Sequence, residues 1–377
     1  MDEREAALWL STLYQLSPPE KAALIDIYGS AYELYGTASA GKIPDEAGQR
    51  IKGVLESCAK GFSAQEVYRK LYKFNADFVA FSDDGFPEKL KSIKIPPIGL
   101  FYKGRLPDEQ APAVSVIGAR ACSDYGKEIT AMLVRELASC GIQVISGLAA
   151  GIDGLSHRAA LDCGGDTFGV LGFGFDKVYP RCNADLFEIM GEKGGIITEY
   201  FMGAYAEKRH FPERNRLIAG LADAVIVIEA RKHSGTIITV DRALEQGKDV
   251  FVVPGRIGDS LSEGCLELIK QGAGIITDVN DLAGVFKDKY PDYIKYERNN
   301  DCNYRFVDKN ERDELLKTLG QNEKKVYRLL GIKPVHIDYL AIKSELDFFA
   351  VLESVSSLIE KNLAAEASPE YYVRKTV

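Results

Sequence analysis

The stretch 211–239 contains residue types that bind anions. Residues 214–216 are Arg-Asn-Arg, and the apolar, β-branched run 224–230 predicts a buried strand of a parallel sheet. The Ser-Gly-Thr segment 234–236 then predicts the start of a helix, where free N–H groups and the helix dipole favour a phosphate. The same segment also fits an ordinary capped helix whose charged neighbours face solvent.

From residue 114 onward, short apolar segments alternate with helical patterns. This alternation predicts an α/β fold with an extended Rossmann-like, doubly wound and mostly parallel sheet. The expected strands are 114–119, 143–149, 167–172, 195–200, 224–230, 249–255 and 274–278. Ligands of such sheets bind beyond the carboxyl ends of the strands. The notable residues at these ends are Gly118, Arg120, Ser146, Gly147, Gly172 and Gly174. A row of phosphate-sized sites suits a polyanion better than a single nucleotide.

Several common motifs are missing or incomplete. The pair Gly172 and Gly174 is followed by Lys177 where a dinucleotide fingerprint needs a third glycine, and no G-x-x-x-x-G-K-[ST] motif occurs. No Ser-His-Asp set is suggested, and His157 is expected to be a helix-packing or hydrogen-bonding residue rather than a catalyst. The cysteines lack a C-x-x-C pair, so we expect neither a metal nor a cofactor.

Composition limits the class of protein. The chain has 377 residues, 46% of them hydrophobic, which is ample for a core and for two or three domains. A net charge of −8 argues against a uniformly basic nucleic-acid binder, although a local basic patch remains compatible with it. Seven irregularly spaced cysteines, no signal peptide and no long apolar run predict a cytoplasmic protein with free thiols and no membrane insertion.

The domain pattern is expected to be tripartite. Residues 1–75 predict a small helical domain of SAM or helix-hairpin type. A packing or interaction module is at least as plausible there, because no Gly-rich hairpin signature occurs. Residues 76–288 predict the Rossmann-like domain. A polar linker is expected at 289–312, followed by a winged-helix-like domain at 313–377. The expected third helix of that last domain is apolar and acidic, so protein contact there is at least as plausible as DNA contact.

Seven segments, in this order, resemble the DNA-processing protein A family (DprA, also called Smf). They are VIGARACSDYG, SGLAAGIDGLSH, LGFGFDKVYPRCN, TEYFMG, FPERNRLIAGLADAVIVIEA, SGTIIT and VFVVPGRIGDSLSEGC. The resemblance covers roughly residues 76–280. Departures from the usual pattern occur at Ala119, Ala150, Ser156 and Phe201, and none removes a charged or glycine position of the motifs.

The resemblance implies a non-enzymatic, homodimeric protein that binds single-stranded DNA. Such a protein protects incoming strands and loads the RecA recombinase during natural transformation. By motif, the implied DNA-binding residues are Gly118, Arg120, Ser146, Gly147, Lys208, Arg214, Asn215, Arg216, Gly235 and Thr236. Phe211 is available for base stacking, although a core position is the alternative for it. The dimer is expected at the end of the sheet, around residues 267–278 and 281–286. There we expect Leu268 to be an exposed apolar residue of its helix, and Ile275 and Ile276 to be buried in their strand.

The competing class is a nucleotide enzyme, a phosphoribohydrolase of the lysine-decarboxylase-like group that shares this type of fold. That group carries a G-G-x-G-T-x-x-E motif with a catalytic Glu, whereas this chain has Thr239 at the equivalent place. A threonine cannot carry the negative charge that an oxocarbenium-like centre needs. We therefore favour the DNA-binding protein.

Overall fold

The computed structural model describes residues 1–296, 304–331 and 334–375. The chain divides into two compact units, which are described separately below. The larger comprises 1–109, 113–135 and 143–275, and the smaller comprises 110–112, 136–142 and 276–377. Within the described residues, no helix combines the length and the apolar character needed to cross a membrane.

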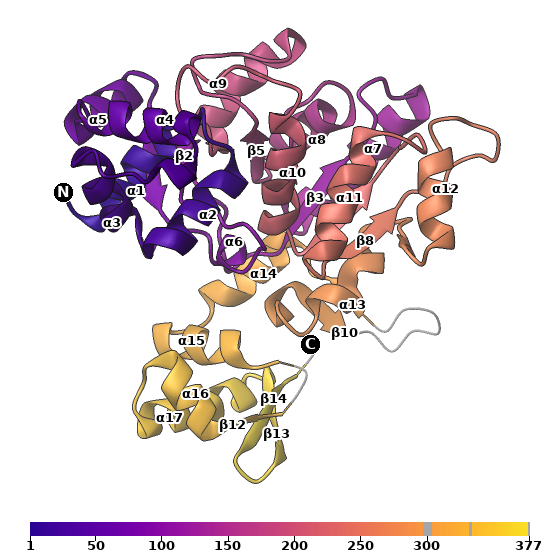
Figure 1. Cartoon of the computed structure of the whole chain (residues 1–377). Helices are drawn as coiled ribbons and strands as arrows, with labels where there is room; N and C mark the ends of the chain where they lie inside the picture. Colours follow the sequence, from indigo (N-terminus) through magenta and orange to yellow (C-terminus); the bar gives the residue numbers. More distant parts are fainter. Residues whose placement is uncertain (297–303, 332–333, 376–377) are drawn as a thin grey trace. The chain divides into compact units, whose positions relative to one another are not determined.

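The larger unit begins with a group of helices that is drawn in indigo and violet in Figure 1. These are α1 (Glu3–Thr12), α2 (Pro18–Tyr28), α3 (Ala31–Ser39), α4 (Gln49–Ala59) and α5 (Ala64–Lys73). Trp9 of α1 is completely buried, and its cluster of buried side chains continues into Phe78, Phe101 and Phe201 of the sheet region. The helices therefore share one hydrophobic core with the sheet.

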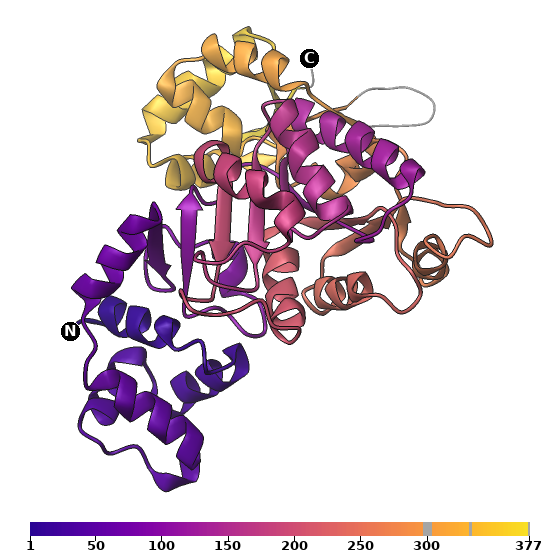
Figure 2. The same cartoon turned by 90° about the horizontal axis from the view of Figure 1, so that it is seen from above.

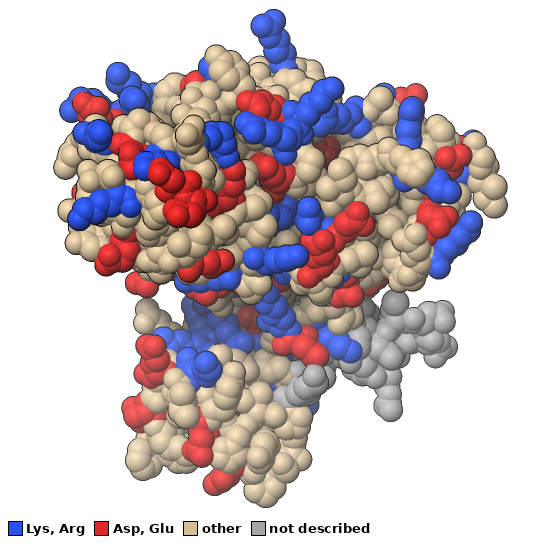
Figure 3. Space-filling view, in the orientation of Figure 1, with Lys and Arg blue, Asp and Glu red and all other residues tan. Residues whose placement is uncertain are grey.

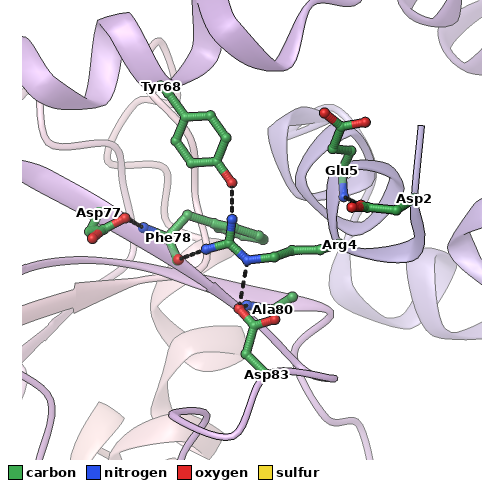
Figure 4. Close-up of polar contacts among 8 residues, drawn as sticks. All are labelled: Asp2, Arg4, Glu5, Tyr68, Asp77, Phe78, Ala80 and Asp83. Carbon is green, nitrogen blue, oxygen red and sulfur yellow. Dashed lines mark hydrogen bonds and ion pairs between the residues drawn. The ribbon is translucent and has the colours of Figure 1, made fainter.

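Arg4 joins the helices to the first strand of the sheet (Figure 4). Its Nε donates to Asp83 Oδ2 at 2.9 Å, Nη2 donates to the Phe78 carbonyl at 3.0 Å, and Nη1 donates to the Tyr68 hydroxyl. One side chain of α1 thus contacts α5, the first strand and the turn that follows it. This planar donor set fixes the orientation of the helices on the sheet edge.

In the described residues the sheet has nine strands in the order β1-β2-β6-β5-β4-β3-β7-β8-β9. The strands are β1 (Ala76–Ala80), β2 (Gly99–Gly104), β3 (Ala113–Ile117), β4 (Gln143–Ser146), β5 (Thr167–Leu171), β6 (Gly195–Thr198), β7 (Ala224–Val227), β8 (Asp249–Val252) and β9 (Gly274–Ile275). All pairings from β6 to β9 are parallel, and β1 and β2 extend the sheet in antiparallel fashion. The predicted mostly parallel α/β fold is confirmed.

Helices cover both faces of this sheet (Figure 2). They are α6 (Glu88–Lys91), α7 (Asp124–Ser139), α8 (Ile152–Asp162), α9 (Ala184–Lys193), α10 (His210–Leu221), α11 (Gly235–Glu245) and α12 (Glu263–Lys270). Strands β4, β5 and β6 are added one after another on one side of β3, whereas β7, β8 and β9 are added on its other side. Because such crossovers are right-handed, the helices after β3 and after β7 lie on opposite faces. The neighbours β3 and β7 therefore form the topological switch point.

The strands are shorter than the sequence predicts at their carboxyl ends. Gly118, residues 147–149 and residues 228–230 lie beyond the hydrogen-bonded ladders, where the chain turns away from the sheet. Leu148 has a φ of 53°, so the backbone leaves β4 through a left-handed conformation. These strand ends, two of which contain Gly118 and Gly147, thus form loops beyond the carboxyl edge of the sheet.

Two expectations about the far end of the sheet are wrong. We expected Leu268 to be an exposed residue of its helix, but it is 6% exposed and packs in the core beneath α12. Ile275 was expected to be buried in its strand, but its side chain is 49% exposed, whereas Ile276 is buried as expected. The reason is that β9 is a two-residue edge strand with a partner on one side only.

The smaller unit contains η3 (Val279–Leu282), α13 (Ala283–Phe286), η4 (Pro291–Tyr293), β10 (Ile294–Tyr296), β11 (Tyr304–Phe306) and α14 (Lys309–Lys317). The predicted linker 289–312 thus includes an antiparallel strand pair and the start of a helix, while its part 297–303 lies outside the described residues. Apolar side chains explain this order, because Ile294 and Phe306 are buried and Phe306 packs on Phe286.

The C-terminal elements are α15 (Gln321–Leu329), β12 (Val335–His336), α16 (Ile337–Ser344), α17 (Phe348–Glu360), β13 (Ala364–Ser368) and β14 (Tyr371–Arg374). The three strands form an antiparallel sheet in the order β12-β14-β13, and the helices pack through Val326, Leu340 and Val355. From this order of elements we propose that the segment is winged-helix-like.

Candidate functional site

A cavity of about 490 Å³ lies at the switch point between β3 and β7. Its walls come from the loop after β3, from α10, from the loop after β7 and from the start of α11. Six of the sequence-predicted residues line it, namely Gly118, Arg120, Arg214, Asn215, Gly235 and Thr236. The segment 211–239 and the loop after β3 therefore line the same cavity, as the α/β pattern requires.

The N-terminus of α11 opens into this cavity. Ser234 occupies the N-cap position with an extended backbone, as predicted, but its side chain makes no capping hydrogen bond. Instead, the Ser234 Oγ is enclosed and has no hydrogen-bond partner in the described residues. A Cβ added at Gly235 would meet nothing within 4 Å, so the helix start is sterically open. The first N–H groups of a helix lack partners inside the helix, and here they face a cavity.

Arg120 and Phe211 stand at the mouth of the cavity. Arg120 is exposed, and its guanidinium lies 5.3 Å from the centre of the Phe211 ring. Neither Arg120 nor the side chain of Asn215 makes a hydrogen bond or an ion pair with any described residue. Phe211 is half-buried, so it borders both the core and the cavity. These groups present a cation, an amide and part of an aromatic face.

Arg214 supports the cavity from below rather than projecting out of it. The side chain is 4% exposed, and its Nη1 donates to the carbonyls of Gly147, at 2.8 Å, and Val170. Burial lowers the pKa of Arg214 to about 10, an effect that nearby Asp153 opposes. Asp153 accepts the Gly147 N–H at 3.0 Å, and burial raises the pKa of this carboxyl group. Together they hold the loop after β4.

The glycine at 147 is explained by this contact. A Cβ built there would lie 2.4 Å from Arg214 Nη1 and 2.6 Å from Asp153 Oδ2. Gly118 is similarly constrained, since its Cβ would lie 2.6 Å from Ile152. Both glycines therefore allow close packing of loops, in addition to any approach by a ligand.

The other predicted residues lie outside the cavity. Ser146 is buried and donates its hydroxyl hydrogen to the Val116 carbonyl at 2.6 Å. Arg216 is 7% exposed and pairs with Glu199. Lys208 is exposed in the loop that precedes α10. We therefore expect Ser146 and Arg216 to shape the site and Lys208 to extend its rim.

Some residues of the site were not predicted. Asp153 lines the cavity, and Tyr179 lies beside Phe211 with a ring-centre distance of 5.9 Å. Glu229 accepts the backbone N–H of Ser123 at 2.9 Å at the start of α7. This carboxylate lies at the α7 N-terminus, whereas the N-terminus of α11 is open to the cavity. The only sequence signal for Glu229 was a charge at the end of an apolar strand.

His157 is confirmed as a packing and hydrogen-bonding residue. It is completely buried, and its Nδ1 lies 2.7 Å from the Thr167 hydroxyl. Within the described ranges, no group of three or more His, Cys, Asp or Glu side chains is arranged to hold a metal ion.

The charge distribution around the site is uneven. Figure 3 shows Lys and Arg side chains gathered near the upper end of α10, although the whole chain has a net charge of −8. Local positive potential of this kind attracts a polyanion to one edge of an acidic protein.

The fold and the cavity define a Rossmann-like α/β protein with an open cavity, lined by hydrogen-bond donors, at the switch point of its sheet. A model of the family described as DNA recombination-mediator protein A matches residues 77–287. Since this match covers more than half of the chain, the protein belongs to that family.

Similar proteins agree with this assignment. The DNA processing protein DprA of Streptococcus pneumoniae is 44% identical over 212 residues, which are 56% of this chain and 75% of that protein. Its X-ray structure is similar with a TM-score of 0.65 and 35% identity, over 75% of this chain and 98% of the other. The Helicobacter pylori DNA processing protein A, whose structure is described for its single-stranded DNA binding mode, gives a TM-score of 0.51 and 30% identity over 57% and 97%.

Proposed function

We propose that this protein binds single-stranded DNA along the carboxyl edge of its sheet. The observation that supports this most strongly is the convergence of an exposed, unpaired Arg120, a free Asn215 amide and the open N-terminus of α11 on one cavity. Each of these groups is a donor that suits a phosphate oxygen. The Helicobacter pylori relative binds single-stranded DNA, which is the ligand we infer for this chain.

Binding of this kind depends little on base sequence. The hydrogen-bond donors of the cavity would contact the DNA phosphate backbone. Phosphate contacts position a strand without specifying its bases. Phe211 adds an aromatic face that accepts any base. We therefore propose a sequence-tolerant site whose affinity depends on salt, because bound cations on the DNA are released.

We further propose that the protein acts by binding and not by catalysis. Of the described residues that line the cavity, one bears a carboxyl group, Asp153, and it is engaged by the Gly147 N–H and by Arg214. Thr239 lines the cavity at the position where the phosphoribohydrolase alternative needs a glutamate. Neither residue is placed to serve as a free base for glycosidic bond cleavage.

The finer role we propose is that of a cytoplasmic homodimeric mediator, which protects incoming single strands and loads RecA during natural transformation. The family's description as a recombination mediator supports this role. Two linked DNA sites would raise the effective concentration of the second one on the same strand.

Fluorescence anisotropy with a labelled single-stranded oligonucleotide and its duplex tests the first proposal. We expect tighter binding to the single strand and a loss of affinity as salt rises. Equal or tighter binding to the duplex would contradict it. For the finer role, the protein is expected to stimulate RecA ATP hydrolysis on DNA coated with single-strand-binding protein, and no stimulation by a DNA-binding-competent protein would refute loading.

A further inference from the structure

Two exposed tyrosines lie on the loops that follow β5 and β6, on the same sheet edge as the cavity. Tyr179 is 44% exposed and Tyr205 is 65% exposed. In the strand order the ends of β3, β4, β5 and β6 are consecutive, so these loops continue the edge on which Arg120 lies. We propose that Tyr179 and Tyr205 form a base-stacking extension of the DNA site, an inference that rests on the proposed function.

Tyr179 is continuous with the cavity wall. Its ring lies 5.9 Å from Phe211 at an interplanar angle of 37°, and 6.3 Å from Phe173 in an edge-on arrangement. A small cleft of about 30 Å³ is lined by Tyr179, Phe211, Arg120 and the loop after β4. Packing on Phe173 and Phe211 holds the ring in place while nearly half of it faces solvent. Bases stack well on aromatic rings that are held in this way.

Tyr205 is held next to a cation. The Nζ of Lys177 lies 4.6 Å from the centre of the Tyr205 ring and 3.0 Å from Asp176 Oδ2. The two loops are joined by further bonds, since the Gly203 N–H donates to Asp176 Oδ1 at 3.0 Å and the Gly174 N–H donates to the Ala204 carbonyl at 3.1 Å. An exposed ring with an ammonium group beside it offers a stacking surface and a phosphate contact within the length of one nucleotide.

The spacing of the strands gives the reach of this extension. Neighbouring strands are about 4.8 Å apart, so the distance from the end of β3 to the end of β6 is roughly 14 Å. A strand stacked at about 3.4 Å per nucleotide covers that distance with about four nucleotides. The tyrosines would therefore contact bases next to those whose phosphates occupy the cavity, and they lengthen the DNA footprint toward the loop after β6.

Abasic DNA separates base stacking from backbone binding. Anisotropy is measured with labelled dT₁₂ and with an oligonucleotide of equal length whose sugars lack bases. The variants are Tyr179→Leu and Tyr205→Leu, which keep apolar volume but lack a π face, together with Tyr179→Phe and Tyr205→Phe. Tyr32→Ala on α3, a tyrosine of similar exposure (49%), is the control. Circular dichroism and thermal unfolding check that each variant is folded.

We expect each leucine variant to bind dT₁₂ about 5-fold more weakly or worse, with little change on abasic DNA. The phenylalanine variants and Tyr32→Ala should bind as the wild type does. Equal losses on both probes, or no loss on either, would overturn the stacking role while leaving DNA binding intact. A wild-type protein that fails to bind dT₁₂ would overturn the proposed function as well, so the two failures are distinguishable.

Discussion

The guanidinium of Arg216 donates from its Nη2 to both carboxylate oxygens of Glu199, each at 2.8 Å, and both side chains are less than a tenth exposed. The pair connects α10 with the segment after β6. Lys21 of α2 is buried nearby, where burial lowers its pKa to about 8 and the Glu199 charge opposes that effect. The arginine that the sequence motif places beside DNA is thus part of a buried network of charges.

This pair predicts that Arg216 contributes mainly to stability. Arg216→Ala should lower the free energy of unfolding by about 3–5 kcal/mol, because Glu199 would remain buried without its partner. Urea unfolding followed by circular dichroism measures the loss. The double variant Arg216→Met with Glu199→Gln should recover part of it, since neither charge is then left alone. Arg216→Ala with unchanged stability and abolished DNA binding would show a direct DNA contact instead.

Arg120 predicts the opposite behaviour. Because it is exposed and makes no ion pair within the described residues, Arg120→Ala should leave stability within about 0.5 kcal/mol of the wild type. The variant should bind all single-stranded sequences more weakly by a similar factor, and the slope of log K against log salt should fall by about 0.7. Arg135→Ala, an exposed arginine of α7, is the matched control. A loss restricted to one base sequence would argue for base readout.

Gly235 tests the open end of α11. A Cβ there meets no atom within 4 Å, so Gly235→Ala should fold normally. If a phosphate approaches the backbone N–H groups, the added methyl group should nevertheless weaken DNA binding. Anisotropy together with thermal unfolding measures both properties. Gly284→Ala on α13, also with open space around its Cβ, is the control for the substitution itself. Unchanged DNA affinity of Gly235→Ala would remove this helix end from the site.

His157 predicts a dependence of stability on pH. Burial, together with the charge of Arg214, lowers its pKa from 6.5 to about 3. Between these values the unfolded chain binds a proton that the folded chain does not, so stability falls as pH falls through this window. Near pH 5 the contribution should approach about 1.4 kcal/mol per pH unit. Urea unfolding at pH 7.5, 6.5 and 5.5 should show a shallower pH dependence for His157→Gln, and an identical dependence would exclude this cause.

The exposed side chain of Ile275 provides a test of the proposed dimer. Its side chain is 49% exposed in the edge strand β9, which pairs only with β8 in the described residues, whereas Leu268 belongs to the interior. Ile275→Arg in the full chain should produce folded monomers that bind DNA more weakly and stimulate RecA less. Sedimentation at micromolar concentration measures the assembly, and Ile342→Arg, an exposed isoleucine of α16, is the control. A monomeric wild type would contradict the proposed homodimer.

The sequence predicted the sheet well because parallel strands are continuous apolar runs and their binding ends are marked by glycines. It did not separate Arg214 from Arg216. Residues two apart on a helix point about 200° away from each other, so one arginine reaches the Gly147 carbonyl and the other reaches Glu199. Their partners are distant in sequence, and only the fold brings them together. Leu268 was misplaced for the same reason, since the inward face of a short helix depends on what it packs against.

The hydrogen bonds of Arg4 and the core around Trp9 limit how the chain can be truncated from its N-terminus. A fragment that starts at residue 76 would lose the side chains that cover Phe78 and Phe101, and would leave the Asp83 carboxylate without the arginine that contacts it. Such a fragment would expose an apolar surface that tends to aggregate. A genetic deletion of the first helices therefore changes the solubility of the protein as well as removing any function of those helices. Point changes on their exposed faces, such as at Tyr72, separate the two effects.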